Sequence, residues 1–547
     1  MKNVSDIVVP HYGPVHADIL ILGDAPNSDD TACLRPFSGK IGELLEVALD
    51  SIGVSKEECR MGYVLNYQPA KDEYKRAFGT RQLEESRAYL DKHLKGTRED
   101  GSPAHRIILT VGDFALNYLL GLDGSEKHRG SVYDYRGMYV LPLYPIAHCR
   151  WDGAKAHTLT IDLHKAKRVL QEGFKEPDFN FVIDPDVFQL EGILSLIRGK
   201  DIVCSDIETK KYTNYIRCIQ FAWSATDAVC IYNDAPYLEG TISIGPTFRR
   251  VVSEILSSEK IEKVFHNGMF DTIMLEENGF EVKNYQYDTM YGQFVLSSQL
   301  PLGLDYITSI YTNINYYKDD GKDATDRIDR KKLGIYGCKD VVATWQCRGA
   351  QLKEFAESPL KWKYLQYKMK QLPLAKHFSR TGLLVDAVRQ DDIRKRVNER
   401  RDQDYQLFFA LLKLLGVEYF TVSQSAKVKD LLYKTLELSP KKNEDGNLTA
   451  NEDAIVDHLT TVSRKLQELK TEKARAQWEQ KLLILKLILN IRGYDKLLGS
   501  YVNIEVSSDG RARSWYKFWG AGTGRWSAAM WYDETGLNGQ TIPRESV

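Results

Sequence analysis

Three short acidic patterns follow one another between Asp201 and Trp345, and they limit what this chain can fold into more than any other feature. The first is Asp206-Ile-Glu208, which lies in the mostly apolar run DIVCSDIET. Such a run is typical of a β-strand, and side chains two residues apart on a strand point to the same face. Asp206 and Glu208 are therefore expected to present two carboxylates together.

The second and third patterns are typical of helices. In KVFHNGMFD a strand over residues 263–265 is expected to run into Asn267, which can cap a following helix that has Asp271 in its first turn. In IYGCKD a spacing of four residues places Tyr336 and Asp340 on one helix face. The chain thus offers two further carboxylates and a phenol on regular elements.

Four carboxylates that meet at one point repel each other, and cations stabilise such a cluster. Oxygen ligands favour hard ions such as Mg²⁺ or Mn²⁺ over zinc. Two such ions about 3.5–4 Å apart stabilise the attacking and leaving oxygens in phosphodiester hydrolysis, and a tyrosine hydroxyl beside them can orient the attacking water. Each pattern alone is more typical of a solvated surface, so the hydrolytic interpretation rests on their ordered combination.

This ordered combination resembles the DEDD-type 3′→5′ exonuclease domain in its tyrosine-bearing subclass, the proofreading domain of A-family DNA polymerases. The stretch LPLGLDYITSIYTNINYYKDDGKD also resembles phage polymerases of that family. The resemblance implies a ribonuclease-H-like α/β domain that acts on single-stranded DNA 3′ ends, with Asn267 at the substrate. It further implies that two Mg²⁺ or Mn²⁺ ions are held by Asp206, Glu208, Asp271 and Asp340, while Tyr336 positions the water.

The first part of the chain alternates strand-like and helix-like runs from ADILILGDAP to MYVLPLY. This alternation predicts an α/β domain with a parallel sheet, whose ligands sit at the carboxyl ends of the strands. Asp24, Asn66 and the YPIAHC loop would lie at those ends. Taken alone, Gly23-Asp24-Ala25-Pro26 is also typical of a tight strand-to-helix turn.

Residues 17–170 resemble the uracil-DNA glycosylase superfamily, especially its family-4 members, through GDAPNSDD, RPFSGKIGELL, GYVLNYQPAKD and ILTVGDFAL. The resemblance implies that Asp24 activates water, Phe37 stacks on a flipped uracil and Asn66 reads its polar edge. Family 4 has Glu at the position of Asp24 and a His-Pro-Ser segment where this chain has YPIAHCR, so His148 is displaced or is a plain loop residue. NYQPAKD contains no cysteine, and no iron–sulfur cluster is expected.

The final third has long helical patterns rich in Lys, Arg and Glu. Its GLLVD, VKDLLY and TGRWS segments resemble the thumb and palm entry of A-family polymerases, in which TGR-x-S lies along the primer–template. The resemblance implies that Arg525 contacts a DNA phosphate. The palm aspartates and the fingers helix of that family do not occur before Val547, so this chain alone is not expected to polymerise DNA.

These observations predict an α/β multidomain chain. They divide it into a glycosylase-like domain (1–175), an exonuclease domain (176–355) and a mainly helical polymerase thumb with an incomplete palm (356–547).

The net charge of the chain is −1, which neither supports nor excludes nucleic acid as a partner. Eight scattered cysteines favour a reducing cytosol. No signal pattern and no membrane span are expected, which places the chain in the cytoplasm of a bacterial host if a phage encodes it.

The preferred interpretation is a replicative proofreading exonuclease that is part of a phage-type A-family DNA polymerase. Its missing palm and fingers either belong to a second polypeptide or are absent through truncation. Three alternatives stay open: a non-catalytic DNA-holding subunit of a split polymerase, an active uracil-DNA glycosylase fused to an exonuclease, and an exonuclease directed at RNA.

Overall fold

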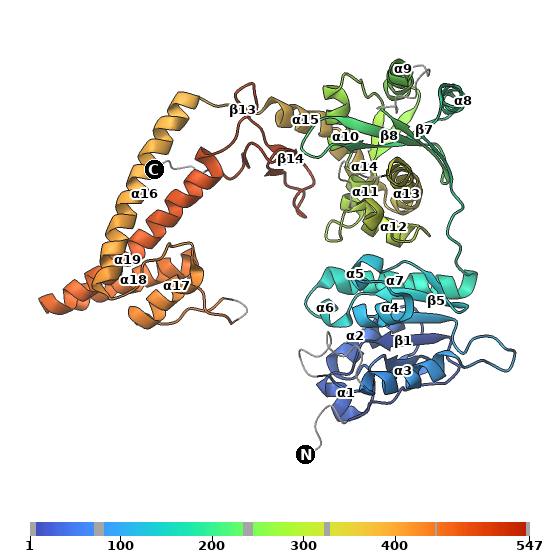
Figure 1. Ribbon diagram of the computed structural model, residues 1–547, viewed down its shortest axis with the longest axis horizontal. Coiled ribbons are helices and arrows are strands. Elements are labelled where there is room, and N and C mark those ends of the chain that lie inside the picture. The colour runs from blue at the N-terminus through green and yellow to red at the C-terminus, as the bar shows by residue number, and fades with distance from the viewer. Residues whose placement is uncertain (1–6, 70–80, 234–243, 322–328, 444–445, 543–547) are drawn as a thin grey trace. The chain divides into compact units, whose positions relative to one another are not determined.

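The structure is a computed structural model that describes residues 7–69, 81–233, 244–321, 329–443 and 446–542 (Figure 1). The chain divides into two units. The first contains residues 1–372 with Gly522–Gly524, and the second contains Pro373–Ala521 with residues 525–547. Among the described residues, no helix is both long enough and apolar enough to cross a membrane.

The first unit begins with a five-stranded sheet in the order β2-β1-β3-β5-β4. Its strands are β1 (Ile19–Gly23), β2 (Arg60–Tyr63), β3 (Ile107–Val111), β4 (Tyr133–Tyr135) and β5 (Met138–Leu143). All neighbours pair in parallel except β4, which is antiparallel to β5 at the edge. Every residue of β1 and β3 is buried, as expected of parallel strands covered on both faces.

Helices cover both faces of this sheet. They are α1 (Ser28–Cys33), α2 (Gly39–Asp50), α3 (Arg81–Leu94), α4 (Asp113–Leu120), α5 (Ser125–His128), α6 (Ile146–Cys149) and α7 (Gly153–Glu172), with a 3₁₀ turn η2 (Lys56–Glu58). Leu45 of α2 and Leu163 of α7 belong to one buried apolar cluster, whereas Leu90 of α3 and Ala115 of α4 belong to another. The sheet therefore lies between two helical layers, each with its own core.

The second sheet of this unit has six strands in the order β11-β10-β7-β8-β9-β6. They are β6 (Asn180–Ile183), β7 (Ile202–Thr209), β8 (Ile216–Ala222), β9 (Asp227–Tyr232), β10 (Glu262–Phe265) and β11 (Tyr285–Asp288). β7, β8 and β9 form an antiparallel meander, while β10 runs parallel to both β7 and β11. β7, which carries the first acidic pattern, thus lies in the middle of the sheet.

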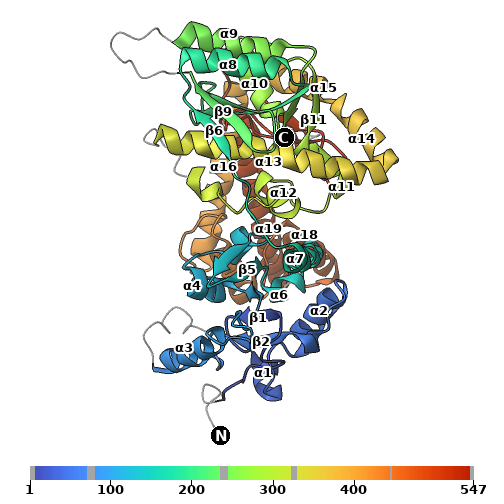
Figure 2. The same ribbon diagram turned by 90° about the vertical axis from the view of Figure 1, so that its right-hand side faces the viewer.

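Helices also cover this sheet on both sides. They are α8 (Val187–Arg198), α9 (Ile244–Ser257), α10 (Met269–Glu277), α11 (Thr289–Leu296), α12 (Leu304–Tyr311), α13 (Arg330–Glu357) and α14 (Pro359–Met369), with a 3₁₀ turn η3 (Lys318–Gly321). α8 and α9 pack on each other, and α13 crosses the opposite face over β7, β8 and β9 (Figure 2). α12 lies beneath α13 and also touches α7 of the first sheet's domain.

The second unit is mainly helical. Its helices are α15 (Leu372–Thr381), α16 (Ala387–Leu414), α17 (Ser425–Asp430), α18 (Glu452–Glu468) and α19 (Glu472–Leu497); the π-turn η4 (Leu431–Thr435) extends α17, and the π-turn η5 (Leu498–Val502) extends α19. Two small ribbons pair β12 (Leu383–Leu384) with β13 (Arg511–Ala512) and β14 (Trp515–Lys517) with β15 (Ser527–Ala529). α16 and α18 pack on α19 around a core that includes Phe408 and Ile488.

Candidate active site

Three carboxylates meet where α13 crosses the middle of the second sheet. Asp206 and Glu208 stand two residues apart on β7, and Asp340 faces them from α13. One ligand oxygen from each lies within 4.8 Å of the others. The two-residue repeat of a strand places the first two on one face, and the helix packed across that face supplies the third.

Asp271 adds a fourth carboxylate beside this group. It lies in the first turn of α10, and only 4% of it is exposed. Its Oδ1 accepts a hydrogen bond of 3.1 Å from the backbone N–H of Ile207, the residue between Asp206 and Glu208. The strand β10, which runs parallel to β7, delivers α10 to this point.

The four side chains form an electrostatically strained set. Burial, and after it neighbouring carboxylates, raise the pKa values of Asp206, Glu208 and Asp271 above the usual range. A bound divalent cation would offset the cost of burial, because it replaces the lost hydration of the carboxylates. It would also offset the repulsion between the carboxylates, because it compensates their negative charge. An all-carboxylate donor set suits Mg²⁺ or Mn²⁺.

Tyr336 lies one helical turn before Asp340 on α13, as the spacing predicted. Burial, and after it Asp340, raise the pKa of its phenol, so the hydroxyl keeps its proton. The backbone of Gly321 packs on the ring so closely that a Cβ there would lie 2.6 Å from Tyr336 Cε2. The ring is therefore fixed between η3 and the helix that carries it.

Two further residues at this site were not predicted as site residues. Lys318 Nζ donates hydrogen bonds of 2.7 Å to both carboxylate oxygens of Asp340 and of 3.2 Å to the Tyr336 hydroxyl. Tyr317 Oη donates to Asp340 Oδ1 at 2.6 Å. The sequence indicated only a charged loop over YYKDDGKDATDRIDRKK, although its lysines were considered as phosphate contacts. Residues 318–321 form a 3₁₀ turn, and residues 322–328 of that loop lie outside the described residues.

The prediction that Asn267 caps α10 is wrong. Gly268 is the N-cap residue, and Asn267 has a left-handed φ of 62°. The buried carboxylate of Asp288 accepts hydrogen bonds from the N–H groups of Asn267 at 3.1 Å and Gly268 at 2.8 Å, and another from Tyr285 Oη. Asp288 thus anchors the turn before α10 from the end of the neighbouring strand, and it is itself the N-cap residue of α11, where it accepts the N–H groups of Met290 and Tyr291.

Asp24 and Asn66 follow β1 and β2 at the carboxyl edge of the first sheet, where the sequence placed them. Asp24 Oδ1 accepts a hydrogen bond of 2.8 Å from the N–H of Ala115, and burial raises the pKa of Asp24 to about 6. Asn66 Oδ1 accepts a hydrogen bond of 2.8 Å from Ser86 Oγ. Gly112 has φ 110°, and a Cβ there would lie 2.3 Å from Asp24 Oδ2, so only glycine fits.

The expected stacking residue, Phe37, is covered by its own domain. Only 2% of it is exposed, and its ring lies 5.0 Å from that of Tyr63. Tyr63 Oη accepts the Phe37 N–H at 3.0 Å and donates to Asp30 Oδ2 at 2.7 Å. A Cβ on Gly23 would lie 2.7 Å from Tyr63 Cε1 and 3.0 Å from Phe37 Cζ, so both rings pack directly against Gly23 of β1. Tyr63 was not predicted as a site residue, because its sequence context is that of an ordinary strand residue.

The remaining predicted residues are exposed. The side chain of His148, on α6, is 54% exposed, and its Nδ1 lies 2.9 Å from Glu126 Oε1. Arg525 lies in the second unit, in the irregular segment between β14 and β15, and is also exposed.

Comparisons with known proteins match two separate parts of the chain. The family described as "Uracil DNA glycosylase superfamily" matches residues 10–160, and the family described as "3'-5' exonuclease" matches residues 182–354. The chain is 29% identical over 131 residues to a type-4 uracil-DNA glycosylase of Archaeoglobus fulgidus, covering 23% of this chain and 61% of that protein. It is 25% identical over 173 residues to a type-4 uracil-DNA glycosylase of Saccharolobus solfataricus, covering 30% of this chain and 76% of that protein.

The fold also resembles a solved polymerase structure, the POL domain of Pol1 from M. smegmatis in complex with DNA primer-template and dNTP. The TM-score is 0.50 at 15% identity, and the likeness covers 67% of this chain and 56% of that one. The resemblances drawn from the sequence are thereby confirmed at the level of domains and fold. The N-terminal domain is of the uracil-DNA glycosylase type, and the second is a 3′→5′ exonuclease domain of the A-family polymerase type.

Proposed function

We propose that this chain is a metal-dependent 3′→5′ exonuclease of DNA and works as the proofreading part of an A-family polymerase. The observation that carries the proposal is the meeting of Asp206, Glu208 and Asp340 within 4.8 Å, with Asp271 bonded to the backbone between the first two. The match of residues 182–354 to an exonuclease family supports it.

In the proposed reaction, a water oxygen attacks the phosphorus of the terminal phosphodiester, and the bond from that phosphorus to the 3′ oxygen of the preceding sugar breaks. The products are a nucleoside 5′-monophosphate and a strand that is one nucleotide shorter. Two Mg²⁺ or Mn²⁺ ions held by the four carboxylates would stabilise the attacking and leaving oxygens. The protonated hydroxyl of Tyr336 would orient the water, and Asn267, half-buried before α10, would contact the terminal nucleotide.

The direct test offers the purified chain a single-stranded DNA carrying a 5′ label, with Mg²⁺, with Mn²⁺ and with EDTA. We expect a ladder that shortens from the 3′ end with either ion and no degradation in EDTA. An RNA strand of the same sequence should be degraded more slowly. A chain that degrades neither strand with either ion would disprove the proposal, and preference for RNA would favour the RNA-directed alternative.

Tyr336→Phe is expected to lower kcat by roughly 10- to 100-fold, because the ring stays packed on Gly321 while the hydroxyl that orients the water is lost. The matched control is Tyr433→Phe, which removes a hydroxyl that donates to Thr449 O in the second unit. Single-turnover degradation of labelled DNA measures both. An unchanged kcat in Tyr336→Phe would exclude Tyr336 from the reaction.

We propose that the N-terminal domain holds DNA without excising uracil, because Phe37, the residue expected to stack on the base, is only 2% exposed and packs against Tyr63. In EDTA, which silences the exonuclease, the wild-type chain is expected to leave a uracil-containing strand free of alkali-sensitive sites. Denaturing gels after alkali treatment measure this. A break at the uracil that disappears in Asp24→Ala would instead show an active glycosylase.

The proposal assigns the helical unit to primer–template DNA, with the exposed Arg525 as a phosphate contact. The polymerase structure that this chain resembles is covered over 56% of its length. We propose as a further partner a second polypeptide that carries a polymerase palm and fingers. Co-purification of the two chains tests this part separately from the nuclease assay.

A further inference from the structure

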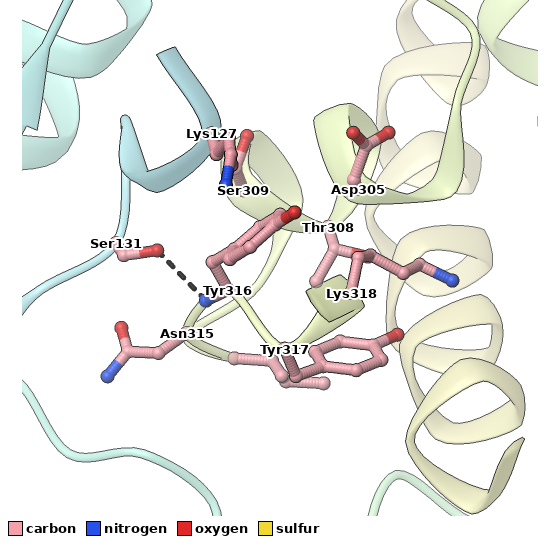
Figure 3. Close-up of a pocket in the computed structure, with 10 residues that line it drawn as sticks. Lys127, Ser131, Asp305, Thr308, Ser309, Asn315, Tyr316, Tyr317 and Lys318 are labelled. Atoms are coloured by element: carbon pink, nitrogen blue, oxygen red, sulfur yellow. Dashed lines mark hydrogen bonds between the residues drawn. The ribbon is translucent and has the colours of Figure 1, made fainter. Parts of the chain in front are cut away.

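Residues 312–321, here called the bridging segment, connect the glycosylase-like domain with the exonuclease carboxylates. At its start, Asn315 pairs with the backbone of Val132: Oδ1 accepts the Val132 N–H at 2.8 Å, and Nδ2 donates to the Val132 O at 2.9 Å. The N–H of Tyr316 donates to Ser131 Oγ at 3.0 Å (Figure 3). Three hydrogen bonds thus fix two consecutive residues of the exonuclease domain to the N-terminal domain.

Charged groups strengthen the same junction. Lys127 Nζ lies 3.1 Å from Asp319 Oδ2, on the turn that follows the Asn315 contact. The buried Lys165 of α7 donates hydrogen bonds of 2.8 Å and 2.9 Å to the carbonyl oxygens of Ser309 and Thr312. The cavity at the junction, lined by Lys127, Ser309 and Tyr316 among others, measures only about 10 Å³ (Figure 3). That is room for no more than about one water molecule.

The other end of the bridging segment reaches the candidate active site. Lys318 Nζ is bonded to both oxygens of Asp340 and to the Tyr336 hydroxyl, and its side chain is only 18% exposed. The ammonium also lies 4.9 Å from the centroid of the Tyr336 ring. A single lysine thus holds a proposed metal ligand and the proposed water-orienting phenol.

Lys318 and a divalent cation would use the same lone pairs of Asp340, so they compete for this carboxylate. A lysine is suited to such an exchange because its ammonium is a point charge on a flexible four-carbon stem. When the carboxylate holds an ion, the ammonium needs another anion nearby. The phosphate of a bound DNA 3′ end would be that anion.

We propose that Lys318 is a further functional residue of the exonuclease, and that its ammonium moves from Asp340 to the scissile phosphate when DNA binds. The glycosylase-like domain is then a structural part of this site, because it positions the bridging segment. The inference rests on the proposed exonuclease function. It gives the N-terminal domain a role that does not require an open base pocket.

The first test is Lys318→Gln in the full chain, with Lys331→Gln as the matched control, since Lys331 is exposed in the first turn of α13. Without DNA, calorimetric titration with Mn²⁺ should show about threefold or greater tightening, because the competing ammonium is gone. With single-stranded DNA and Mg²⁺, kcat should fall by about 10-fold or more, because a phosphate contact is lost. A purely structural lysine would not change these two quantities in opposite directions.

The second test is Asn315→Ala, which removes the side chain that joins the bridging segment to Val132 of the N-terminal domain. The matched control is Asn180→Ala, which removes a hydrogen bond of 2.9 Å to Asp227 at the edge of the sheet. Asn315→Ala is expected to shift both quantities in the direction of Lys318→Gln by about threefold, since the turn that carries Lys318 loses its anchor. The control should match the wild type.

The outcomes separate this inference from the function on which it rests. A wild type without nuclease activity would overturn the exonuclease proposal. An active wild type with unchanged Mn²⁺ affinity and kcat in both variants would overturn only the inference. Faster degradation of DNA by Lys318→Gln would also overturn the inference, because Lys318 would then inhibit the exonuclease site and not assist the reaction.

Discussion

Replacement of Asp206 by Asn is expected to abolish the proposed exonuclease and to stabilise the metal-free chain. Activity should fall by roughly 10³-fold or more, since an amide is a poor ligand for a divalent ion and the remaining carboxylates cannot keep both ions in place. Labelled single-stranded DNA with Mg²⁺ measures this loss. Asp201→Asn, at an exposed position just before β7, is the matched control and should degrade DNA at the wild-type rate.

The stabilisation has a defined pH dependence. Burial and neighbouring carboxylates raise the pKa of Asp206 from 3.8 to about 7. Between these two values the folded metal-free chain binds more protons than the unfolded chain, so stability falls as pH rises. In EDTA, Asp206→Asn should therefore raise the free energy of unfolding by on the order of 1–3 kcal/mol at pH 8 and by much less at pH 4.

Thermal unfolding at the two pH values, in EDTA and separately with Mn²⁺ in place of EDTA, measures this effect. Mn²⁺ should raise the Tm of the wild type at pH 8 more than that of Asp206→Asn. A Tm that falls at pH 8 after the substitution would contradict the view that the four carboxylates repel one another in the absence of an ion.

Asp162→Ala is expected to destabilise the first unit by about 3–5 kcal/mol. Asp162 is completely buried on α7, and its Oδ1 accepts a hydrogen bond of 3.1 Å from Arg129, which is itself 2% exposed and donates to Ser309 Oγ of the exonuclease domain. Without Asp162, the guanidinium of Arg129 would be a buried cation that has lost this carboxylate as its counter-charge. Urea unfolding followed by tryptophan fluorescence measures the change.

The control for this prediction is Asp178→Ala. Asp178 forms an ion pair of 2.6 Å with Lys175, but its side chain is 87% exposed, so its loss should change stability by less than about 1 kcal/mol. Equal effects of the two substitutions would show that the contact between α7 and α12 contributes little to the stability of the unit. Asp162→Ala should also weaken the exonuclease, because α12 leads directly into the bridging segment.

Local periodicity was sufficient to predict much of the candidate exonuclease site. Asp206 and Glu208 share a face because a strand repeats every two residues, and Tyr336 and Asp340 share one because they lie one helical turn apart. These rules depend only on neighbouring residues in the chain. The alternation of strands and helices likewise predicted the parallel sheet of the N-terminal domain, which is confirmed together with the multidomain α/β fold.

The surroundings of a side chain were harder to predict where its neighbour in the fold lies far away in the sequence. Asn267 has the side chain of a helix cap, but Gly268 is the N-cap residue, and Asp288, 21 residues beyond Asn267, holds the turn through the backbone N–H of Asn267. Phe37 was expected to stack on a flipped uracil, and the structure packs its ring against Tyr63 of β2. In both cases the competing residue has no unusual sequence context, and only the pairing of strands brings it near.

The sequence by itself determined which residues carry the chemistry and how they are spaced along each strand or helix, because those spacings follow from the short-range geometry of the backbone. Only the tertiary structure decided which of these elements face each other. It placed Lys318 on Asp340, joined the bridging segment to Val132 and packed Phe37 against Tyr63. Such contacts depend on the path of the chain between elements and on the packing of side chains, and neither leaves a periodic pattern in the sequence.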